Sequence, residues 1–278
     1  MVYVKLLGGL GNQMFQYAVG RHLSIKNSDS LMLDLTDLLK REDIDYTPRE
    51  FELDIFDVKY TGKILASERR TFKERFALKY LTRRVDEIDY IFDPEVLGLK
   101  GNLYLNGFWQ NEKYFNGIED IIRQDFTLKA KVLPLNDLTV KKISSINSVS
   151  VHFRRGDYLS NPTAKNIHGV VEVGYYKKAL TKISELVESP HFFIFSDDID
   201  WVRENFVFEQ EHTFISHDAC AAYDMHLMSL CKHNITANSS FSWWGAWLNR
   251  NPDKIVISPQ QWINAIQTEI VPEHWMKF

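Results

Sequence analysis

The sequence that decides the fold is Val149-Ser150-Val151-His152-Phe153-Arg154-Arg155-Gly156-Asp157-Tyr158. Its first residues alternate between apolar and polar, which is typical of a short β-strand. Two arginines, a glycine that permits a sharp turn, and an aspartate follow directly. Arginine presents a planar fork of donors to paired anionic oxygens, and ligands of α/β sheets bind beyond the strands' carboxyl ends. A surface turn with local salt bridges is the alternative interpretation.

Two further predicted strands of the second half also end in polar residues. Residues 192–195 lead into Ser196-Asp197-Asp198, and residues 235–237 lead into Asn238-Ser239-Ser240. A helix is predicted over 175–187 and a last strand over 254–258. Ends of parallel strands meet at one sheet edge, so we expect a single site there. Arginines and serine hydroxyls suit a diphosphate, and a carboxylate suits the donor edge of guanine.

The first half begins as a βαβ unit. We predict a strand over 2–7, a tight glycine turn over 8–12, a helix over 13–26 with Phe15, Ala18, Val19, His22 and Leu23 inward, and strands over 31–35 and 103–107. Met14 stands where a dinucleotide-binding turn needs its third glycine, which argues against such a site. Asn12 and Gln13 suit a sugar or a phosphate at the helix start, with helix capping as the alternative. Trp109 suits stacking on a sugar, although packing explains it equally well.

Composition restricts the class of protein. Hydrophobic residues make up 45% and charged residues 25% of 278, as in ordinary globular chains. A net charge of −4 argues against a general nucleic-acid binder. Because no apolar run reaches about 18 residues, we expect a cytoplasmic protein, either free or peripherally bound at the inner face of the plasma membrane. The basic stretch from Arg69 to Arg84, read as a helix, suits either an anionic membrane surface or an ordinary solvated face.

Neither the cysteines nor the acidic strings of this sequence predict a metal site. Cys220 and Cys231 fall on the apolar face of a helix predicted over 219–233, so two buried reduced thiols are expected rather than zinc ligands. Asp198-Ile199-Asp200 has the D-x-D form of some metal-binding transferases, but the same form recurs at Asp43-Ile44-Asp45. With two arginines available for a diphosphate, no metal and no other cofactor is expected.

Four stretches together resemble the bacterial α1,2-fucosyltransferases of glycosyltransferase family 11. They occur in the family's order, span residues 8 to 248, and are Gly8-Gly9-Leu10-Gly11-Asn12-Gln13-Met14-Phe15-Gln16-Tyr17, His152-Phe153-Arg154-Arg155-Gly156-Asp157, Phe195-Ser196-Asp197-Asp198 and Asn238-Ser239-Ser240-Phe241-Ser242-Trp243-Trp244-Gly245-Ala246-Trp247-Leu248. The second is similar to the H-x-R-R-x-D motif of α1,2-, α1,6- and protein O-fucosyltransferases. One such stretch would say little, but four in register are specific.

The resemblance implies an α/β fold of GT-B type, with two Rossmann-like domains facing a central cleft. Turn formers over 133–147 place the boundary there, giving residues 1–145 as the acceptor-side domain and residues 146–278 as the donor domain. It also implies a galactoside 2-α-L-fucosyltransferase. Such an enzyme transfers L-fucose from GDP-β-L-fucose to the 2-hydroxyl of a terminal β-galactoside of an O-antigen, capsule or oligosaccharide, and inverts the configuration at the anomeric carbon. The alternative is an enzyme of the same fold that uses another GDP-sugar, acceptor or linkage, such as α1,6. The third hypothesis is a non-catalytic carbohydrate-binding protein.

The resemblance further suggests roles for individual residues. Arg154 would contact the β-phosphate and His152 the nucleotide, Asp197 or Asp198 would bind guanine, and Arg155, Ser239, Ser240 and Ser242 would complete the GDP-fucose site. Gln13, Trp109 and His168 are the candidates for the acceptor side of the cleft.

The general base is left open by the sequence. Asp157 is one candidate for accepting the acceptor hydroxyl's proton, but it would equally well pair with the arginines. Asn12 would instead orient that hydroxyl. Trp243 and Trp247 lie one helical turn apart, so packing is expected of them rather than sugar stacking.

Overall fold

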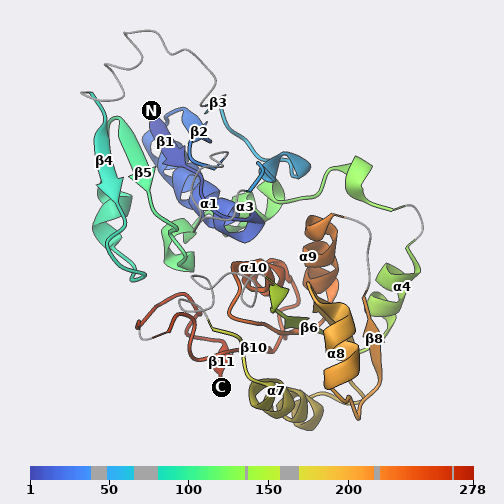
Figure 1. Ribbon diagram of the computed structural model, residues 1–278. Coiled ribbons are helices and arrows are strands. Elements are labelled where there is room, and N and C mark those ends of the chain that lie inside the picture. Colours follow the sequence, from blue (N-terminus) through green and yellow to red (C-terminus); the bar gives the residue numbers. More distant parts are fainter. Residues whose placement is uncertain (39–48, 66–80, 135–136, 157–168, 216–219, 265) are drawn as a thin grey trace. The chain divides into compact units, whose positions relative to one another are not determined.

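The computed structural model describes residues 1–38, 49–65, 81–134, 137–156, 169–215, 220–264 and 266–278 (Figure 1). They form two compact units: unit 1 comprises Met1–Thr127 and Thr268–Ile270, and unit 2 comprises Leu128–Gln267 and Val271–Phe278. The division thus precedes the boundary predicted at residue 145. Helix α4 (Leu138–Ser145) joins unit 2 because the Asp137 carboxylate accepts a hydrogen bond from Tyr223 and Lys142 donates one to Thr213.

Unit 1 contains a five-stranded, fully parallel sheet in the order β3-β2-β1-β5-β4. On the central strand β1, Val2 and Val4 are fully buried and face α1. Gly20 of α1 lies so close to this strand that a Cβ added to it would be 2.3 Å from Val4 Cγ2. The predicted Rossmann-like beginning is therefore confirmed. The helices and strands of this unit are β1 (Val2–Lys5), α1 (Leu10–Asn27), β2 (Leu31–Asp34), β3 (Gly62–Ile64), β4 (Arg83–Asp86), β5 (Leu103–Asn106) and α3 (Glu119–Asp125), with short 3-10 turns at Leu53–Ile55, Pro94–Gly98 and Glu112–Phe115.

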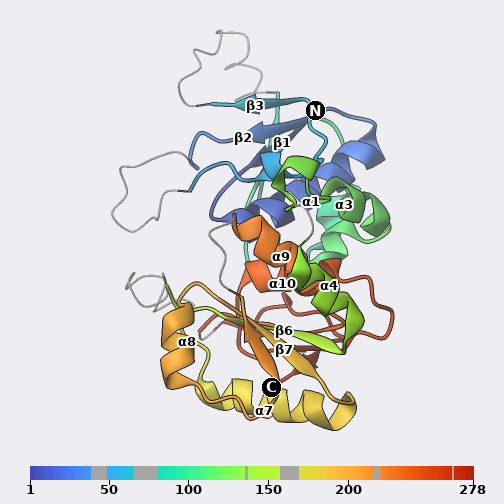
Figure 2. The same cartoon turned by 90° about the vertical axis from the view of Figure 1, so that its right-hand side faces the viewer.

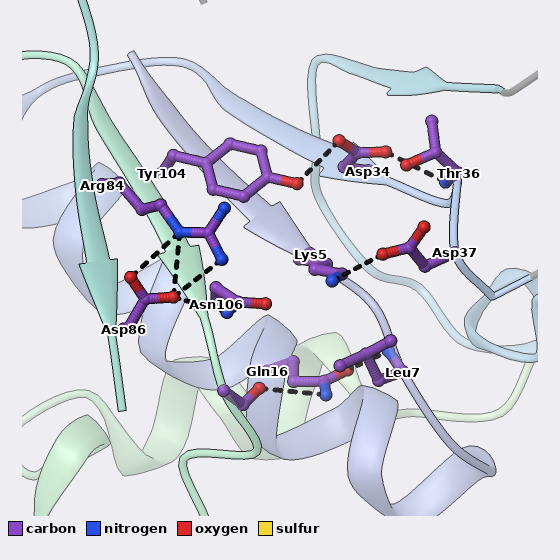
Figure 3. A network of polar contacts seen from close by, with 11 residues as sticks. Lys5, Leu7, Gln16, Asp34, Thr36, Asp37, Arg84, Asp86, Tyr104 and Asn106 are labelled. Atoms are coloured by element: carbon purple, nitrogen blue, oxygen red, sulfur yellow. Dashed lines mark hydrogen bonds and ion pairs between the residues drawn. The ribbon is translucent and has the colours of Figure 1, made fainter. Parts of the chain in front are cut away.

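The opposite face of this sheet holds a polar network, shown in Figure 3. The Tyr104 hydroxyl donates to Asp34 at 2.9 Å, and Lys5 forms an ion pair with Asp37 at 2.5 Å. Arg84 and Asp86 form an ion pair within β4. Since Arg83 and Arg84 belong to a strand, the predicted basic helix does not extend to them; its residues 69–79 lie outside the described part of the chain.

Unit 2 contains a six-stranded parallel sheet in the order β11-β10-β9-β6-β7-β8. The decisive strand, β6, is buried along its whole length and lies between β9 and β7. The remaining elements are a 3-10 turn at Ala130–Val132, β6 (Ser148–Phe153), α7 (Val173–Leu186), β7 (His191–Ser196), α8 (Ile199–Asn205), β8 (His212–Phe214), α9 (Ala221–Leu230), β9 (His233–Ile235), α10 (Ser240–Leu248), β10 (Val256–Ser258) and β11 (Met276–Lys277). The third predicted strand, over 235–237, begins and ends two residues earlier than expected.

Helices cover both faces of this sheet, with α7 on one side and α9 and α10 on the other (Figure 2). Alternate residues of β6, Val149, Val151 and Phe153, join the apolar cluster that includes α7. The residues between them point the other way: Ser150 accepts a hydrogen bond from Asn234 at 2.7 Å, and His152 contacts Phe241 of α10. A strand with alternating apolar and polar residues is therefore fully buried, and the Ser148 and Ser150 hydroxyls of its polar face are bonded internally.

The expectation for the cysteines is half right. Cys231 is buried, and burial raises the pKa of its thiol, whereas Cys220 is exposed at the start of α9. The helix is shorter than predicted, which leaves Cys220 outside it.

Packing of the tryptophans is confirmed, since Trp243 and Trp247 are buried with stacked rings whose centroids are 6.2 Å apart. Among the described residues, no helix has the length and apolar character needed to cross a membrane.

Candidate active site

In unit 2, the loops after β6 and β7 are joined through the Asp197 carboxylate. Its Oδ1 accepts the Arg155 N–H at 2.9 Å and its Oδ2 accepts the Gly156 N–H at 3.0 Å. The same Oδ2 forms an ion pair with Arg154 Nη1 at 2.9 Å. Phe153 and Ser196 are partners in the parallel register, which brings the two loops to one edge of the sheet. Asp197 therefore fixes the arginine loop, and both of its carboxylate oxygens are engaged there.

Position 156 needs a glycine because Asp197 leaves no room there for a side chain. It lacks the positive φ that a glycine-specific turn would need. A Cβ on residue 156 would lie 2.7 Å from Asp197 Oδ2, which is closer than real Cβ contacts. The predicted turn role is therefore replaced by close approach: the missing side chain lets the backbone N–H reach the carboxylate.

The two arginines have different surroundings. Arg154 is bound to Asp197, and 23% of its side chain is exposed. The Arg155 guanidinium lies over the ring of Trp201 in α8, with its carbon 3.2 Å from the ring centroid. Arg155 Nε is 3.5 Å from Asp198 Oδ2, and only 15% of its side chain is exposed. Arg155 is thus packed as a cation–π partner, while Arg154 is the more accessible cation at this edge. Trp201 was not singled out from the sequence.

His152 lies beneath this loop as a neutral imidazole. Burial lowers its pKa to about 4; the Asp197 charge opposes this shift and Arg154 adds to it. Its ring centroid is 5.6 Å from that of Phe241 in α10. Among the described residues, the buried Nδ1 has no hydrogen-bond partner. At neutral pH, His152 is therefore able to form a hydrogen bond but brings no charge.

The start of α10 completes this edge of unit 2. Ser239 is the residue before the helix, and within the described chain its side chain makes no capping hydrogen bond; Ser240 is half-buried. The first N–H groups of a helix attract anions, and here they follow β9, the neighbour of β6. Ser242 differs from the other two serines. It is buried and accepts the Ala237 N–H at 3.2 Å while donating to Ser239 O at 3.3 Å, so it holds the turn and does not line the site as predicted.

The predicted residues of unit 1 separate into buried supports and one half-buried group. Gln13 is fully buried and bonds Gly8 O, Glu50 O and Glu52 N, so it fastens the backbone and is not an acceptor contact. Trp109 is 1% exposed and packs edge-on against Tyr114. Both predictions of an acceptor contact are therefore corrected by burial.

Asn12 stays half-buried in the first turn of α1, and its side chain does not cap the helix: its Oδ1 accepts a 2.7 Å hydrogen bond from Gln110 Nε2. Helix α1 begins at Leu10, earlier than predicted, because Gly8 has a φ of +74° and completes the turn at once. Gln110 had no role in the sequence interpretation. It follows β5, the neighbour of β1, and this adjacency was the signal that would have found it.

Two predicted residues, Asp157 and His168, lie outside the described residues. Within the described part of the chain, no three His, Cys, Asp or Glu side chains gather as metal ligands would. Both acids of the D-x-D string instead contact arginines: Asp198 is near Arg155, and Asp200 pairs with Arg203 at 3.2 Å.

Comparison with known proteins places this geometry in a family. The model of glycosyl transferase family 11 matches residues 1–276. The Escherichia coli O-antigen biosynthesis glycosyltransferase WbnK is 35% identical over 286 residues, covering 94% of each chain. An α-1,2-colitosyltransferase of the same organism is 36% identical over 299 residues, covering 100% of this chain and 98% of that protein.

Among solved structures, the α-1,6-fucosyltransferase NodZ soaked with GDP-fucose aligns with a TM-score of 0.50 at 13% identity, covering 89% of this chain and 91% of that one. This likeness concerns the fold alone, which is the GT-B type expected from the sequence. The family match and the two relatives extend over nearly the whole chain at more than 30% identity, and the chain therefore belongs to glycosyl transferase family 11.

Proposed function

We propose that this glycosyltransferase moves L-fucose from GDP-β-L-fucose to the 2-hydroxyl of a terminal β-galactoside, with inversion to an α1,2 linkage. The observation that carries the proposal is the Asp197-bound Arg154 at the end of β6, at the same sheet edge as the start of α10. A guanidinium and helix N–H groups together suit a diphosphate. The acceptor is a galactose-terminated O-antigen, capsule or oligosaccharide chain, in keeping with the O-antigen relative.

The chemical step is displacement at the anomeric carbon of fucose. The acceptor oxygen attacks from the face opposite GDP, the bond to the β-phosphate oxygen breaks, and GDP leaves with increased negative charge. Arg154 stabilises that charge, and Ser239 and Ser240 with the first N–H groups of α10 bind the phosphates. With a fixed cation in place the reaction needs no metal ion, and GDP-fucose is the substrate, not a resident cofactor.

The nucleotide is bound by the remaining residues of the unit 2 edge. Asp198 is 38% exposed and binds the guanine edge, because both oxygens of Asp197 are engaged by the arginine loop. Arg155, held on Trp201, positions Asp198. His152, neutral at pH 7, forms a hydrogen bond to the nucleotide.

Asp157 is the proposed general base. Asp197 already forms the ion pair with Arg154, which removes the main reason to assign Asp157 to that structural role. The Asp157 carboxylate, which follows Gly156 in the sequence, would take the proton of the attacking hydroxyl as the new bond forms. Asn12, as the alternative, would orient that hydroxyl in a more dissociative reaction.

Transfer of a different GDP-sugar is the second candidate function. It is favoured by one observation, the 36% identity to an α-1,2-colitosyltransferase over the whole chain. A donor with colitose in place of fucose would use the same diphosphate and guanine contacts. A non-catalytic carbohydrate-binding protein would need none of them, so stabilisation by GDP in a thermal melt separates that class.

The test is sugar transfer to lactose in EDTA, with GDP-fucose and GDP-colitose supplied separately to wild type and Arg154→Ala. We expect α1,2-fucosyllactose without metal, and about a 100- to 1000-fold lower rate in the variant. Faster transfer of colitose would favour the second candidate. GDP binding without transfer from either donor to any β-galactoside would contradict the proposed acceptor, and absence of GDP binding would contradict the donor site.

A further inference from the structure

We propose that Gln110 and Asn12 of unit 1 form a neutral amide pair that binds one hydroxyl of the acceptor sugar; this inference rests on the proposed transferase function. The two residues are far apart in sequence but meet because the loops after β1 and β5 share one edge of the parallel sheet. Gln110 Nε2 is 2.7 Å from Asn12 Oδ1. Asn12 is half-buried and Gln110 is 9% exposed.

Asn12 is held from the side of α1. Gly8 has a φ of +74°, and a Cβ there would lie 2.4 Å from Asn12 Nδ2. Glycine at this position therefore provides the space that the amide occupies. The neighbouring Gln13 makes three hydrogen bonds to backbone and fixes the turn from within.

Gln110 is held by a loop that is fastened at several points. The Glu87 carboxylate accepts the N–H groups of Phe108 at 2.7 Å and Trp109 at 3.0 Å. Gln16 accepts the Leu7 N–H and donates to Gly107 O, which ties this loop to the end of β1 (Figure 3). Trp109 has a φ of +57°, a conformation rare for a large side chain, and so reverses the chain just before Gln110.

The two amides have hydrogen-bonding groups that they do not use with each other, and these groups fit a hydroxyl. In the described part of the chain, Asn12 Nδ2 and Gln110 Oε1 have no partner, which leaves one donor beside one acceptor. Exchanging O and N in both amides would still leave one donor and one acceptor, so the match does not depend on amide orientation. A sugar hydroxyl both donates and accepts, and a neutral pair binds it without changing its charge.

The loop that carries Gln110 also holds an aromatic ring that suits a sugar. Phe108, two residues before Gln110, lies nearly parallel to Tyr90, with ring centroids 6.3 Å apart and planes inclined by 15°. Both rings are partly exposed. Aromatic rings with an apolar face and a nearby hydrogen-bonding group are suited to the apolar face and hydroxyls of a hexose.

The experiment compares steady-state transfer by wild type, Gln110→Ala, Asn12→Ala and the double variant, with lactose as acceptor. We expect about a 10-fold higher acceptor KM in Gln110→Ala, and a double variant no weaker than the more affected single variant. The KM for GDP-fucose should change much less than the acceptor KM in Gln110→Ala, because the amide pair is assigned to the acceptor and not to the donor. Gln124→Ala, an exposed amide of α3, is the matched control and should behave as wild type.

A series of monodeoxy galactosides identifies the bound hydroxyl. For wild type, the analogue that lacks the bound hydroxyl should bind more weakly than the parent galactoside. For Gln110→Ala, that analogue and the parent galactoside should bind equally well. Equal losses in both proteins for every analogue, or an unchanged acceptor KM in Gln110→Ala and Asn12→Ala, would overturn the inference. If Gln110→Ala fails to fold in a thermal melt, the near-isosteric Gln110→Glu takes its place in the same comparison. Absence of transfer by wild type would instead contradict the proposed function.

Discussion

The two sheet edges of this protein share a construction and differ in charge. In each unit, loops after neighbouring parallel strands meet, and a glycine makes room for one polar side chain: Gly8 for Asn12 in unit 1, and Gly156 for Asp197 in unit 2. The unit 2 edge is built from ion-paired arginines and aspartates, whereas the Asn12–Gln110 pair of unit 1 is neutral. The difference matches the proposed substrates, because a diphosphate needs fixed cations and a sugar hydroxyl needs only paired donors and acceptors.

Among variants that alter the support of Arg154 and not Arg154 itself, the largest loss of activity is expected when the charged edge is made to resemble the neutral one. Asp197→Asn removes the charge opposite Arg154 and places an amide donor against one of the two backbone N–H groups. We expect about a 100-fold lower kcat in transfer from GDP-fucose, because Arg154 loses the position from which it stabilises the leaving diphosphate.

The neighbouring Asp198→Asn is the matched control. It should mainly weaken discrimination between GDP and other nucleoside diphosphates, measured by competitive inhibition. Loss of guanine selectivity in Asp197→Asn, with kcat maintained, would return the guanine role to Asp197.

A second prediction concerns His152, which burial keeps neutral beneath the charged edge. Between pH 6.5 and about 4, the unfolded chain binds a proton at His152 that the folded protein does not, so folding stability falls as the pH falls through this window. The loss attributable to His152 is about 3 kcal/mol by pH 4.

Urea unfolding of wild type and His152→Gln at pH 7 and pH 5 checks this expectation. Burial also lowers the pKa values of His191, His226 and His233, but these contribute to both proteins alike. The variant should therefore show the smaller loss on acidification. An identical pH dependence in the two proteins would mean that His152 is protonated in the folded state.

The smallest effect is expected from the glycine of the charged edge. Gly156→Ala places a methyl group 2.7 Å from Asp197 Oδ2, so the carboxylate must shift, and we expect kcat/KM to fall by about 10-fold. Gly174→Ala in α7 is the control, because a Cβ there would meet nothing within 4 Å. Unchanged kinetics in Gly156→Ala would show that the arginine loop tolerates movement.

Local pattern was sufficient to predict the parallel strands and the edge where their polar ends meet. Residues 149–153, 192–195 and 103–106 lie in the strands expected of them, because a buried strand needs only a short apolar or alternating run. The division into the two compact units does not follow from local pattern, since α4 belongs to unit 2 through contacts of Asp137 and Lys142 with residues far along the chain. The internal hydrogen bonds of Asp197, Ser242 and Gln13 were likewise not predicted, because a motif does not show which of its polar groups are already bonded internally.

The sequence by itself determined the family, the two α/β halves and the residues that end each strand, because these follow from short-range periodicity and from motifs that are contiguous in the chain. Only the tertiary structure decided which of those residues are already bonded inside the protein. Asp197 turns to the backbone of Arg155 and Gly156, and Gln110 turns to Asn12, through contacts that span 41 to 98 residues. Such pairings depend on strand order and on the space left by glycines, neither of which is encoded locally.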